Sequence, residues 1–338
     1  MNKLHIITLQ HAAGREKYGF DMMISRLREL GDVWINMLEE EGPSLSALAA
    51  PLAEADVLVA GWGCDPVPAQ LYDHAPNLQR VVLIGSSVKP LSPHAAWGKD
   101  LIITNTADEI GSAAAEYTLG LMLRWLHRFE VFDDAMHERE PWPSSRLHHM
   151  QRDLRDMPVG LVGFGAIGRR LTGALIALDA QVRVFDPFVP DSLLAEFGAE
   201  RCNDLQELMG ACDIVSLHAG LTDETRHMIG ADELQAMRED ALLVNTARGG
   251  LIDTDALVSE LRRERIHAAI DVFDPEPLPL SHPLRTLPNA LLGPHMAGTY
   301  NRSLYQRVMD AAVDEVQRLS EGLRAKRVVT PEMFARMT

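Results

Sequence analysis

The stretch that decides the fold is Val159–Gly168, which reads VGLVGFGAIG. It begins with a short apolar run of the kind found in a buried strand. Gly163, Gly165 and Gly168 then follow with the spacing G-x-G-x-x-G. After this turn, apolar residues recur on one face of a helix, at Ile167, Leu171, Ala174, Leu175 and Leu178. The glycines therefore stand where a strand turns into a helix, which is the context of a dinucleotide-binding turn.

Each glycine of this turn has its own physical reason. Gly163 permits a tight turn, Gly165 lets a pyrophosphate approach the backbone, and Gly168 lets the helix pack closely on the strand. The N-terminus of the following helix points unpaired N–H groups toward the phosphates. Because glycine-rich turns also arise by chance, the motif needs support from the residues that follow it.

That support comes from the next strand, Gln181–Phe185, and the acidic residue after it. Asp186 lies 18 residues beyond Gly168, near the separation of about 20 at which an acidic residue bonds the adenosine ribose. A carboxylate at this place would repel a 2′-phosphate, so we expect NAD rather than NADP. The alternative for Asp186 is a simple strand-end turn with Pro187.

Composition narrows the class of protein. A length of 338 residues suggests about two domains at roughly 150 residues each. The net charge of −16 argues against nucleic acid or an anionic membrane as a partner. The start, MNKLHIITLQ, lacks the apolar core of a signal peptide, and no stretch approaches the ~20 apolar residues of a membrane span. We therefore expect a cytoplasmic protein.

The cysteines and histidines give no metal pattern. Cys64, Cys202 and Cys212 form no CxxC and no ligand spacing. We expect them to be buried thiols in a reducing compartment. His148 and His149 lie in a polar stretch without an acidic residue or a cysteine at ligand spacing, which favours a solvated pair. We expect no metal site.

Strand-like and helical segments alternate along the chain, which predicts parallel α/β sheets. Before the glycine turn the expected strands are 4–9, 32–36, 57–60, 81–84 and 101–103. Including that turn, the expected strands of a six-stranded doubly wound unit are 159–162, 181–185, 213–218, 241–246, 268–273 and 290–295. The loops GWGCD (61–65) and GSSVK (85–89) follow strands, where such sheets bind ligands.

Three further segments complete the predicted organisation. Residues 112–129 form an unusually apolar helix, which we expect to be buried between domains or subunits. Residues 131–157 are polar and irregular, and predict an arm or a long loop that carries Trp142. The last helix, about 303–322, has room to return to the first half of the chain.

Several motifs now resemble the D-isomer-specific 2-hydroxyacid dehydrogenases, in the order found in that family. They are VGLVGFGAIGRRL (159–171), VFDP (184–187), DIVSLHAGLTDETRHMI (213–229), LLVNTARGGLIDTDAL (242–257), AAIDVFDPEPL (268–278), HPL (282–284) and LLGPHMAG (291–298), with weaker matches at 105–123 and 153–160. The resemblance covers roughly residues 78–325. Within the family, the sequence is similar to the glyoxylate and hydroxypyruvate reductases and to the phosphoglycerate dehydrogenases. We expect no C-terminal regulatory domain.

The resemblance implies two flavodoxin-like or Rossmann-like doubly wound domains with the site in an interdomain cleft. A substrate-binding domain would comprise 1–109 and 302–338, and an NAD-binding Rossmann domain, 110–301, would be inserted between them. The inserted position speaks against L-lactate and L-malate dehydrogenases, whose glycine turn opens the chain. A homodimer through the NAD-binding domain is implied, with residues 125–155 wrapping the partner.

The resemblance also implies which residues catalyse the reduction of a 2-oxo acid. Arg248, in NTARGG, would bind the carboxylate and polarise the carbonyl through bidentate donors. His295, in GPHMAG, would protonate the oxygen as hydride arrives and accept that proton in the oxidation. Glu276, in DPEP, would hydrogen-bond His295 and favour its protonated form. The alternatives are a surface arginine, a structural histidine and a solvated loop carboxylate.

The implied cofactor contacts extend around the same strand ends. Ala166 and Ile167 would offer backbone N–H groups to the pyrophosphate, and Asp271 would hold the nicotinamide carboxamide. The other implied NAD-binding residues are Gly163, Gly165, Gly168, Asp186, His218, Thr246, Ala247, Arg248, His295 and Gly298.

The chain departs from the family near the expected substrate. A G-x-G-x-D-x-x-D-like loop is common where this sequence has GSSVKPL (85–91). Backbone N–H groups of Ser86, Ser87 and Val88 could still hold a carboxylate, while Lys89 either adds a cation or is solvated. The stretch Gly61-Trp62-Gly63 replaces the Arg/Ser-bearing stretch of phosphoglycerate dehydrogenases, which weighs against a phosphorylated substrate.

Aromatic residues suggest the walls of a substrate pocket, at Trp62 and Tyr300. Trp142 either reaches a partner's cleft or packs at the interface. Two other functions remain open on the same fold. An NADH-sensing corepressor-like binding protein could retain the same three catalytic residues. Formate or phosphite oxidation is less favoured, since formate dehydrogenases typically have Gln where this chain has Glu276.

Overall fold

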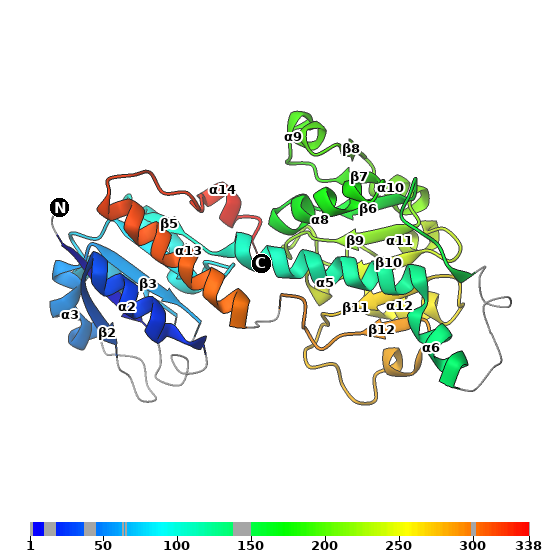
Figure 1. Cartoon of the computed structure of the whole chain (residues 1–338), viewed down its shortest axis with the longest axis horizontal. Coiled ribbons are helices and arrows are strands. Elements are labelled where there is room, and N and C mark those ends of the chain that lie inside the picture. The colour runs from blue at the N-terminus through cyan, green and yellow to red at the C-terminus, as the bar shows by residue number, and fades with distance from the viewer. Residues whose placement is uncertain are drawn as a thin grey trace. The chain divides into compact units, whose positions relative to one another are not determined.

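The computed structural model describes residues 3–9, 18–36, 45–62, 64, 66–137, 150–298 and 302–337. The chain divides into two compact units (Figure 1). Unit 1 comprises Met1–Ile110 and Tyr300–Thr338, and unit 2 comprises Gly111–Thr299. These limits fall one or two residues from the domain limits expected from the sequence. The cleft expected between the two domains stays a prediction.

Unit 1 contains a five-stranded parallel sheet. Its strands are β1 (Leu4–Leu9), β2 (Gly31–Asn36), β3 (Val57–Gly61), β4 (Arg80–Ile84) and β5 (Ile102–Thr104). They are ordered β2-β1-β3-β4-β5, and all pairs are parallel. This is the flavodoxin-like order. The expected strands are confirmed with small shifts at their ends.

Helices cover the sheet of unit 1. They are α2 (Phe20–Leu30), α3 (Leu45–Glu54), η1 (Ala69–His74), η2 (Lys89–Leu91), α4 (Pro93–Trp97), α13 (Arg302–Ser320) and α14 (Pro331–Phe334). Helix α13 contacts α2 and β4, and it buries apolar residues such as Val308 and Val316. The last long helix therefore does pack on the first part of the chain, as the sequence indicated.

A buried ion pair joins α13 to strand β4 of this sheet. Arg80, at the start of β4, is 2% exposed, and Glu315 on α13 is fully buried. Arg80 Nη1 lies 3.7 Å from Glu315 Oε2, and it donates a hydrogen bond to the backbone carbonyl of Glu315. Glu315 Oε1 also accepts from Arg327 Nη1 at 3.2 Å and from the Arg327 N–H at 3.0 Å. The Glu315 carboxylate thus connects α13 to β4 and to the C-terminal segment that contains Arg327.

Unit 2 contains a seven-stranded parallel sheet. Its strands are β6 (Pro158–Val162), β7 (Gln181–Phe185), β8 (Glu200–Arg201), β9 (Ile214–Leu217), β10 (Leu242–Asn245), β11 (His267–Ile270) and β12 (Ala290–Leu292). The order β12-β11-β10-β9-β6-β7-β8 is the Rossmann order with one additional strand at the β12 edge. The expectation of six strands was wrong. The missed strand is β8, whose two charged residues give no apolar run.

Helices lie on both faces of this sheet (Figure 1). One face is covered by α5 (Ala107–His127) and α8 (Ala166–Ala177), and the other by α10 (Leu205–Ala211), α11 (Ala231–Ala236) and α12 (Thr254–Leu261). The remaining short helices are α6 (Phe129–His137), α9 (Asp191–Glu196), η4 (Gly249–Leu251) and η5 (Pro283–Thr286). Helix α8 stops at Ala177, so Leu178 is exposed rather than on the buried face.

The apolar helix and the arm also differ from their expected limits. Helix α5 begins five residues earlier than expected and ends at His127. The predicted irregular segment begins with the regular helix α6, because Phe129, Val131, Phe132 and Ala135 continue a helical apolar pattern. Residues 138–149, with Trp142, His148 and His149, lie outside the described residues.

A polar network forms where β10 and β11 begin. Asp240 precedes β10, and its Oδ1 accepts a hydrogen bond from His267 Nε2 at 2.8 Å. Its Oδ2 accepts from Arg152 Nη2 at 2.8 Å. The Arg152 guanidinium carbon lies 4.1 Å from the centre of the Trp125 ring, a cation–π contact. The network joins the end of α5 to the chain that leads into β6.

Over the described parts of the chain, no helix is both long and apolar enough to cross a membrane.

Candidate active site

The strands of unit 2 end at a common level. Val162 pairs with Phe185 and with Leu217, and Leu217 pairs with Asn245. Asn245 in turn pairs with Ile270, and Ile270 with Leu292. Ligands bind outside the carboxyl ends of such strands. This edge carries the residues that follow each strand, namely Gly163, Asp186, His218, Thr246–Arg248, Asp271 and His295.

The glycine turn has the geometry that its spacing predicts. Gly163 has φ 99°, and a Cβ there would lie 2.8 Å from the backbone nitrogen of Ala219. A Cβ on Gly168 would lie 2.5 Å from the carbonyl oxygen of Gly163. In contrast, no atom lies within 4 Å of a Cβ on Gly165. Gly163 and Gly168 are thus needed for packing, while Gly165 leaves open space at the first turn of α8, where Ala166 and Ile167 lie.

Asp186 lies beside this turn. Its Oδ2 accepts a hydrogen bond from the Phe164 N–H at 2.8 Å, and its Oδ1 accepts from the Phe188 N–H at 3.0 Å. Arg201 donates to the Asp186 carbonyl at 2.8 Å and pairs with Asp191. The carboxylate is therefore fixed at the mouth of the glycine turn, next to the open position at Gly165.

His218 follows β9 and packs against Gly163. A Cβ on Gly163 would lie 2.8 Å from the carbonyl carbon of His218. His218 Nε2 is 3.0 Å from Ser216 Oγ, and its Nδ1 is buried without a hydrogen-bond partner among the described residues. Burial lowers the pKa of His218 to about 4, so this imidazole is neutral at physiological pH.

His295 and Glu276 form a hydrogen-bonded pair. His295 Nδ1 lies 2.8 Å from Glu276 Oε2, and Glu276 Oε1 accepts the Phe273 N–H at 2.8 Å. Since an ionised carboxylate only accepts hydrogen bonds, the proton of this contact lies on Nδ1. Burial raises the pKa of Glu276, but the hydrogen bonds from His295 and Phe273 outweigh it and hold that pKa below its usual value.

Arg248 is held close to this pair. Asn245 Nδ2 donates to the Arg248 carbonyl at 2.9 Å, and Asn245 Oδ1 accepts the Ala247 N–H at 3.0 Å. A Cβ on Gly249 would overlap the backbone of Phe273, so the turn that carries Arg248 is pressed against the turn that leads to Glu276. The Arg248 guanidinium also helps to lower the pKa of Glu276.

The other expected cofactor residues lie at the same edge. Thr246 Oγ1 is 2.9 Å from Thr118 Oγ1 on α5, and Ala247 is buried. Asp271 is buried, and its carboxylate accepts two backbone N–H groups of the turn that carries His295. Gly298 has φ 80° and ends that turn. Neither these hydrogen bonds of Asp271 nor the part of Asn245 in fixing the Arg248 turn was predicted from the sequence.

In unit 1, a loop with unpaired backbone donors follows β4. The Gly85 N–H donates to Thr106 Oγ1 at 2.9 Å, and Asn105 Nδ2 donates to the Ser86 carbonyl at 2.7 Å. The backbone N–H groups of residues 86–88 donate no hydrogen bond to the described residues. Ser87 Oγ is buried and lacks a partner there as well. Lys89 is exposed.

Aromatic side chains from three distant segments meet near this loop. The Trp62 ring centre lies 5.6 Å from that of Tyr18 and 6.0 Å from that of Tyr305. The Trp62 Nε1 atom would be 3.6 Å from a Cβ on Gly85. Only Trp62 was predicted from the sequence, because residues 18 and 305 lie far from it along the chain. Tyr300 lies outside the described residues.

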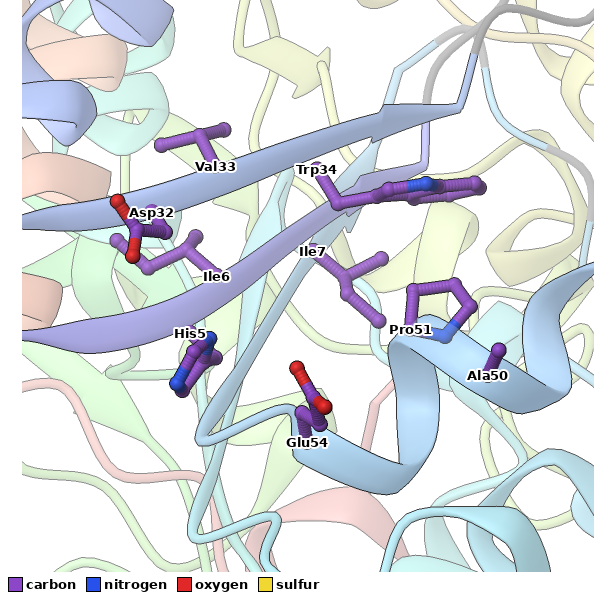
Figure 2. A pocket seen from close by; sticks show the side chains of 9 residues that line it. All are labelled: His5, Ile6, Ile7, Asp32, Val33, Trp34, Ala50, Pro51 and Glu54. Carbon is purple, nitrogen blue, oxygen red and sulfur yellow. The ribbon is translucent and has the colours of Figure 1, made fainter.

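A groove of about 450 Å³ lies elsewhere in unit 1, between β1, β2 and α3 (Figure 2). His5, Trp34 and Glu54 are among its lining residues. It contains none of the residues predicted from the sequence, and it lies along the strands rather than beyond their carboxyl ends. We therefore place the candidate site at the strand ends and not in this groove.

The residues present fit a nicotinamide dinucleotide. The space beside Gly165, the first turn of α8 and the buried, unpaired Nδ1 of His218 lie together at the switch point between β6 and β9. Across the described ranges, no group of three His, Cys, Asp or Glu side chains is arranged to hold a metal ion. The three cysteines are free thiols.

Comparison with known proteins agrees with this geometry. Residues 119–297 match the family described as "D-isomer specific 2-hydroxyacid dehydrogenase, NAD binding domain". The chain is 31% identical over 315 residues to a glyoxylate reductase of Thermofilum pendens, with 92% of each chain covered. It is 31% identical over 307 residues to a D-3-phosphoglycerate dehydrogenase of Methanocaldococcus jannaschii, covering 90% of this chain but 57% of that protein.

A solved structure shows the same architecture over the whole length. A phosphoglycerate oxidoreductase from Rhizobium etli superposes with a TM-score of 0.83 at 25% identity, and covers 97% of this chain and 98% of its own. The chain belongs to the D-isomer-specific 2-hydroxyacid dehydrogenase family. It is accordingly an oxidoreductase that acts on CH–OH groups and binds a nicotinamide cofactor.

Proposed function

We propose that the protein is an NAD(H)-dependent D-2-hydroxyacid dehydrogenase that also catalyses the reverse reaction, the reduction of a 2-oxo acid. The observation that carries the proposal is the His295–Glu276 pair with Arg248 beside it. A paired imidazole can deliver and accept a proton, and a guanidinium can neutralise a carboxylate. Their meeting at the carboxyl ends of β10, β11 and β12 supports a shared role.

The residues divide the reaction as follows. When bound, NADH supplies the hydride for C2 of the 2-oxo acid. Arg248 binds the substrate carboxylate and polarises the carbonyl. His295, whose Nδ1–H is held by Glu276, presents a protonated Nε2 to the carbonyl oxygen and protonates it. In the oxidation, neutral His295 removes the hydroxyl proton, and the ionised Glu276 stabilises the resulting imidazolium.

The cofactor is NAD rather than NADP in this proposal. The support is the Asp186 carboxylate, which the N–H groups of Phe164 and Phe188 hold beside the glycine turn. A fixed negative charge there favours a ribose hydroxyl and repels a 2′-phosphate. Gly163, Gly165, Gly168, Ala166 and Ile167 would form the pyrophosphate cradle. His218, Thr246, Ala247 and Gly298 would line the rest of the cofactor, and Asp271 lies at the same edge but is buried.

The substrate in this proposal is a small 2-oxo acid. The unpaired N–H groups of Ser86, Ser87 and Val88 support binding of a carboxylate in unit 1, and the exposed Lys89 adds a cation nearby. The cluster of Tyr18, Trp62 and Tyr305 supports an apolar wall and weighs against a phosphorylated side chain. Relatives of this chain include glyoxylate reductases, a glycerate dehydrogenase and an (S)-sulfolactate dehydrogenase.

The test is the loss of NADH absorbance with glyoxylate, hydroxypyruvate, pyruvate and phenylpyruvate, repeated with NADPH. We expect turnover of at least one acid, a preference for NADH, and loss of turnover at saturating NADH in Arg248→Ala and His295→Asn. Intact turnover in either variant would refute the assigned roles. NADH binding without turnover of any acid would instead favour an NADH-sensing, corepressor-like binding protein.

We also infer a cytoplasmic homodimer that associates through unit 2. Helix α6 exposes Phe129 and Met136, at 59% and 53%, which supports an apolar contact on that unit. The three free thiols support a reducing compartment. Light scattering after gel filtration tests the dimer, and Phe129→Asp should shift it toward the monomer. An unchanged mass would remove α6 from the interface.

A further inference from the structure

The turn that carries His295 is wrapped around one buried carboxylate. Asp271 follows β11 and is 1% exposed. Its Oδ1 accepts the Met296 N–H at 2.8 Å, and its Oδ2 accepts the Ala297 N–H at 2.6 Å. Its backbone carbonyl accepts the His295 N–H at 2.7 Å. The residue that follows β11 thus accepts hydrogen bonds from three consecutive N–H groups of the chain that follows β12.

These three hydrogen bonds fix an unfavourable backbone conformation. His295 has φ 58°, in the left-handed region that few residues other than glycine adopt readily. Such a conformation persists only where its surroundings hold it. The bonds to Asp271 lie directly at and after His295, so they are placed to maintain the direction in which its side chain leaves the backbone.

Two other residues close the space around the Asp271 carboxylate. The Tyr117 hydroxyl on α5 lies 3.4 Å from Asp271 Oδ1. Burial, together with the Asp271 carboxylate, raises the pKa of Tyr117, so the phenol stays a neutral donor. Next to this hydroxyl, a Cβ on Gly293 would overlap Oδ1 and lie 2.8 Å from the Tyr117 hydroxyl. A side chain at position 293 would therefore displace the carboxylate.

We propose that Asp271 is the positioning residue of His295, acting through the backbone of residues 295–297 to keep Nδ1 against Glu276. This inference rests on the proposed function only for the catalytic part of its consequence. It differs from a contact with the nicotinamide carboxamide, because it requires no atom of the cofactor. Tyr117 and Gly293 support this arrangement: the Tyr117 hydroxyl donates to Oδ1, and the lack of a side chain at Gly293 leaves room for that oxygen.

A first experiment tests the hydrogen bonds between Asp271 and residues 295–297 without measuring enzyme activity. Hydrogen–deuterium exchange of the peptide that contains residues 293–298 is compared between the wild type and Asp271→Asn, in which the amide NH₂ faces one of the two backbone donors. We expect faster exchange in this peptide, with no change in peptides of unit 1. Equal exchange in the two proteins would overturn the proposal, whether or not the protein reduces a 2-oxo acid.

A double-mutant cycle then separates positioning from cofactor contact. Asp271→Asn should lower kcat by about 100-fold, the effect of a small misplacement of a catalytic group. The dissociation constant for NADH, measured by its fluorescence, should change by less than about threefold. In a His295→Asn background the same substitution should change kcat/KM by less than about twofold, because interacting residues are not additive. Asparagine is chosen at 295 because it tolerates a positive φ.

Two more variants keep the result interpretable. Tyr117→Phe removes one neutral contact and keeps the carboxylate, so kcat should fall by about threefold or less. Gly293→Ala leaves Asp271, Glu276 and His295 intact but displaces the carboxylate, so it should reproduce the Asp271→Asn loss and its faster exchange. If the effects of Asp271→Asn and His295→Asn on kcat/KM were fully additive, and Asp271→Asn also weakened NADH binding, Asp271 would be a cofactor-binding residue. That result would refute the positioning role.

Discussion

The carboxylate of Asp186 holds the middle of the glycine turn, since its Oδ2 accepts the N–H of Phe164 at 2.8 Å. Phe164 stands between Gly163 and Gly165, so the residue expected to read the ribose also shapes the loop expected to hold the phosphates. Binding of the ribose by Asp186 and binding of the phosphates by the glycine turn should therefore depend on each other in this protein.

The glycines of this turn should separate binding from stability. At Gly165 the backbone has φ −74° and a Cβ meets no atom within 4 Å. Gly165→Ala should keep the unfolding temperature and weaken NADH binding by roughly tenfold or more. Gly163→Ala, at φ 99° and against Ala219, should lower the free energy of unfolding by about 1–3 kcal/mol. Calorimetry with and without NADH compares the two, and equal unfolding temperatures would contradict the prediction.

Replacing Glu276 should change the pH dependence of activity. Its lowered pKa keeps the carboxylate ionised beside His295 at neutral pH. Glu276→Gln removes the charge that stabilises the protonated imidazole, so the decline of 2-oxo acid reduction with rising pH should begin at a lower pH. We expect kcat/KM at neutral pH to fall by about 100-fold. Profiles of kcat/KM against pH measure both effects, and an unshifted profile would show that the carboxylate does not act on His295.

Asp240 should stabilise unit 2 in a pH-dependent way. Its hydrogen bond from His267 and the charge of Arg152 lower the pKa of Asp240 against the effect of burial. A lowered folded-state pKa contributes stability above the unfolded value of about 3.9, and that stability is lost as the pH falls through the folded value. Asp240→Asn, which tolerates the positive φ at this position, should unfold about 2–4 °C lower at pH 7.

The difference between Asp240→Asn and the wild type should shrink as the pH falls below about 4, where the carboxylate of the unfolded state becomes protonated, and should be lost as the pH passes below the lowered pKa of the folded state. Urea unfolding at neutral and acidic pH measures this. A difference that stays constant with pH would mean that the charge of Asp240 is not its source.

Breaking the Arg80–Glu315 pair should be costly for unit 1. Arg80→Met leaves a buried carboxylate with fewer partners, and should lower the free energy of unfolding by about 3–5 kcal/mol. Glu315→Leu removes the counter-charge of Arg80 and the acceptor of the N–H groups of Lys326 and Arg327, so its effect should be at least as large. Urea denaturation followed by circular dichroism compares them. Wild-type stability in either variant would show that the pair contributes little.

Local patterns predicted much of this protein. The apolar runs located every strand longer than two residues, and the spacing of the glycines, with Asp186 beyond them, indicated the cofactor edge. Those signals are contained in a few neighbouring residues. Strand β8 was missed because its pairing with β7 comes from tertiary context, and α6 was missed because polar residues masked its short apolar face.

Other parts of the site depend on residues far apart in the sequence. Asp271 meets Met296 and Ala297 only because β11 and β12 are neighbours in the sheet, and Tyr117 reaches them from α5. Tyr18, Trp62 and Tyr305 meet only after unit 1 has folded. No window of the sequence holds such information, so family resemblance supplied the roles of Arg248, Glu276 and His295, and the structure supplied their geometry.

The return of α13 to unit 1 sets an order for biosynthesis. Unit 2 is one continuous stretch of sequence, so all of its residues are synthesised before α13. Arg80 is made early, yet its counter-charge lies 235 residues later on α13. Until that helix emerges, the sheet of unit 1 lacks one of its covering helices, and Arg80 lacks its counter-charge. Because domains fold as units during synthesis, unit 2 should be able to fold first. A released chain that ends before residue 302 should therefore contain a folded unit 2 and a unit 1 that proteases still cleave.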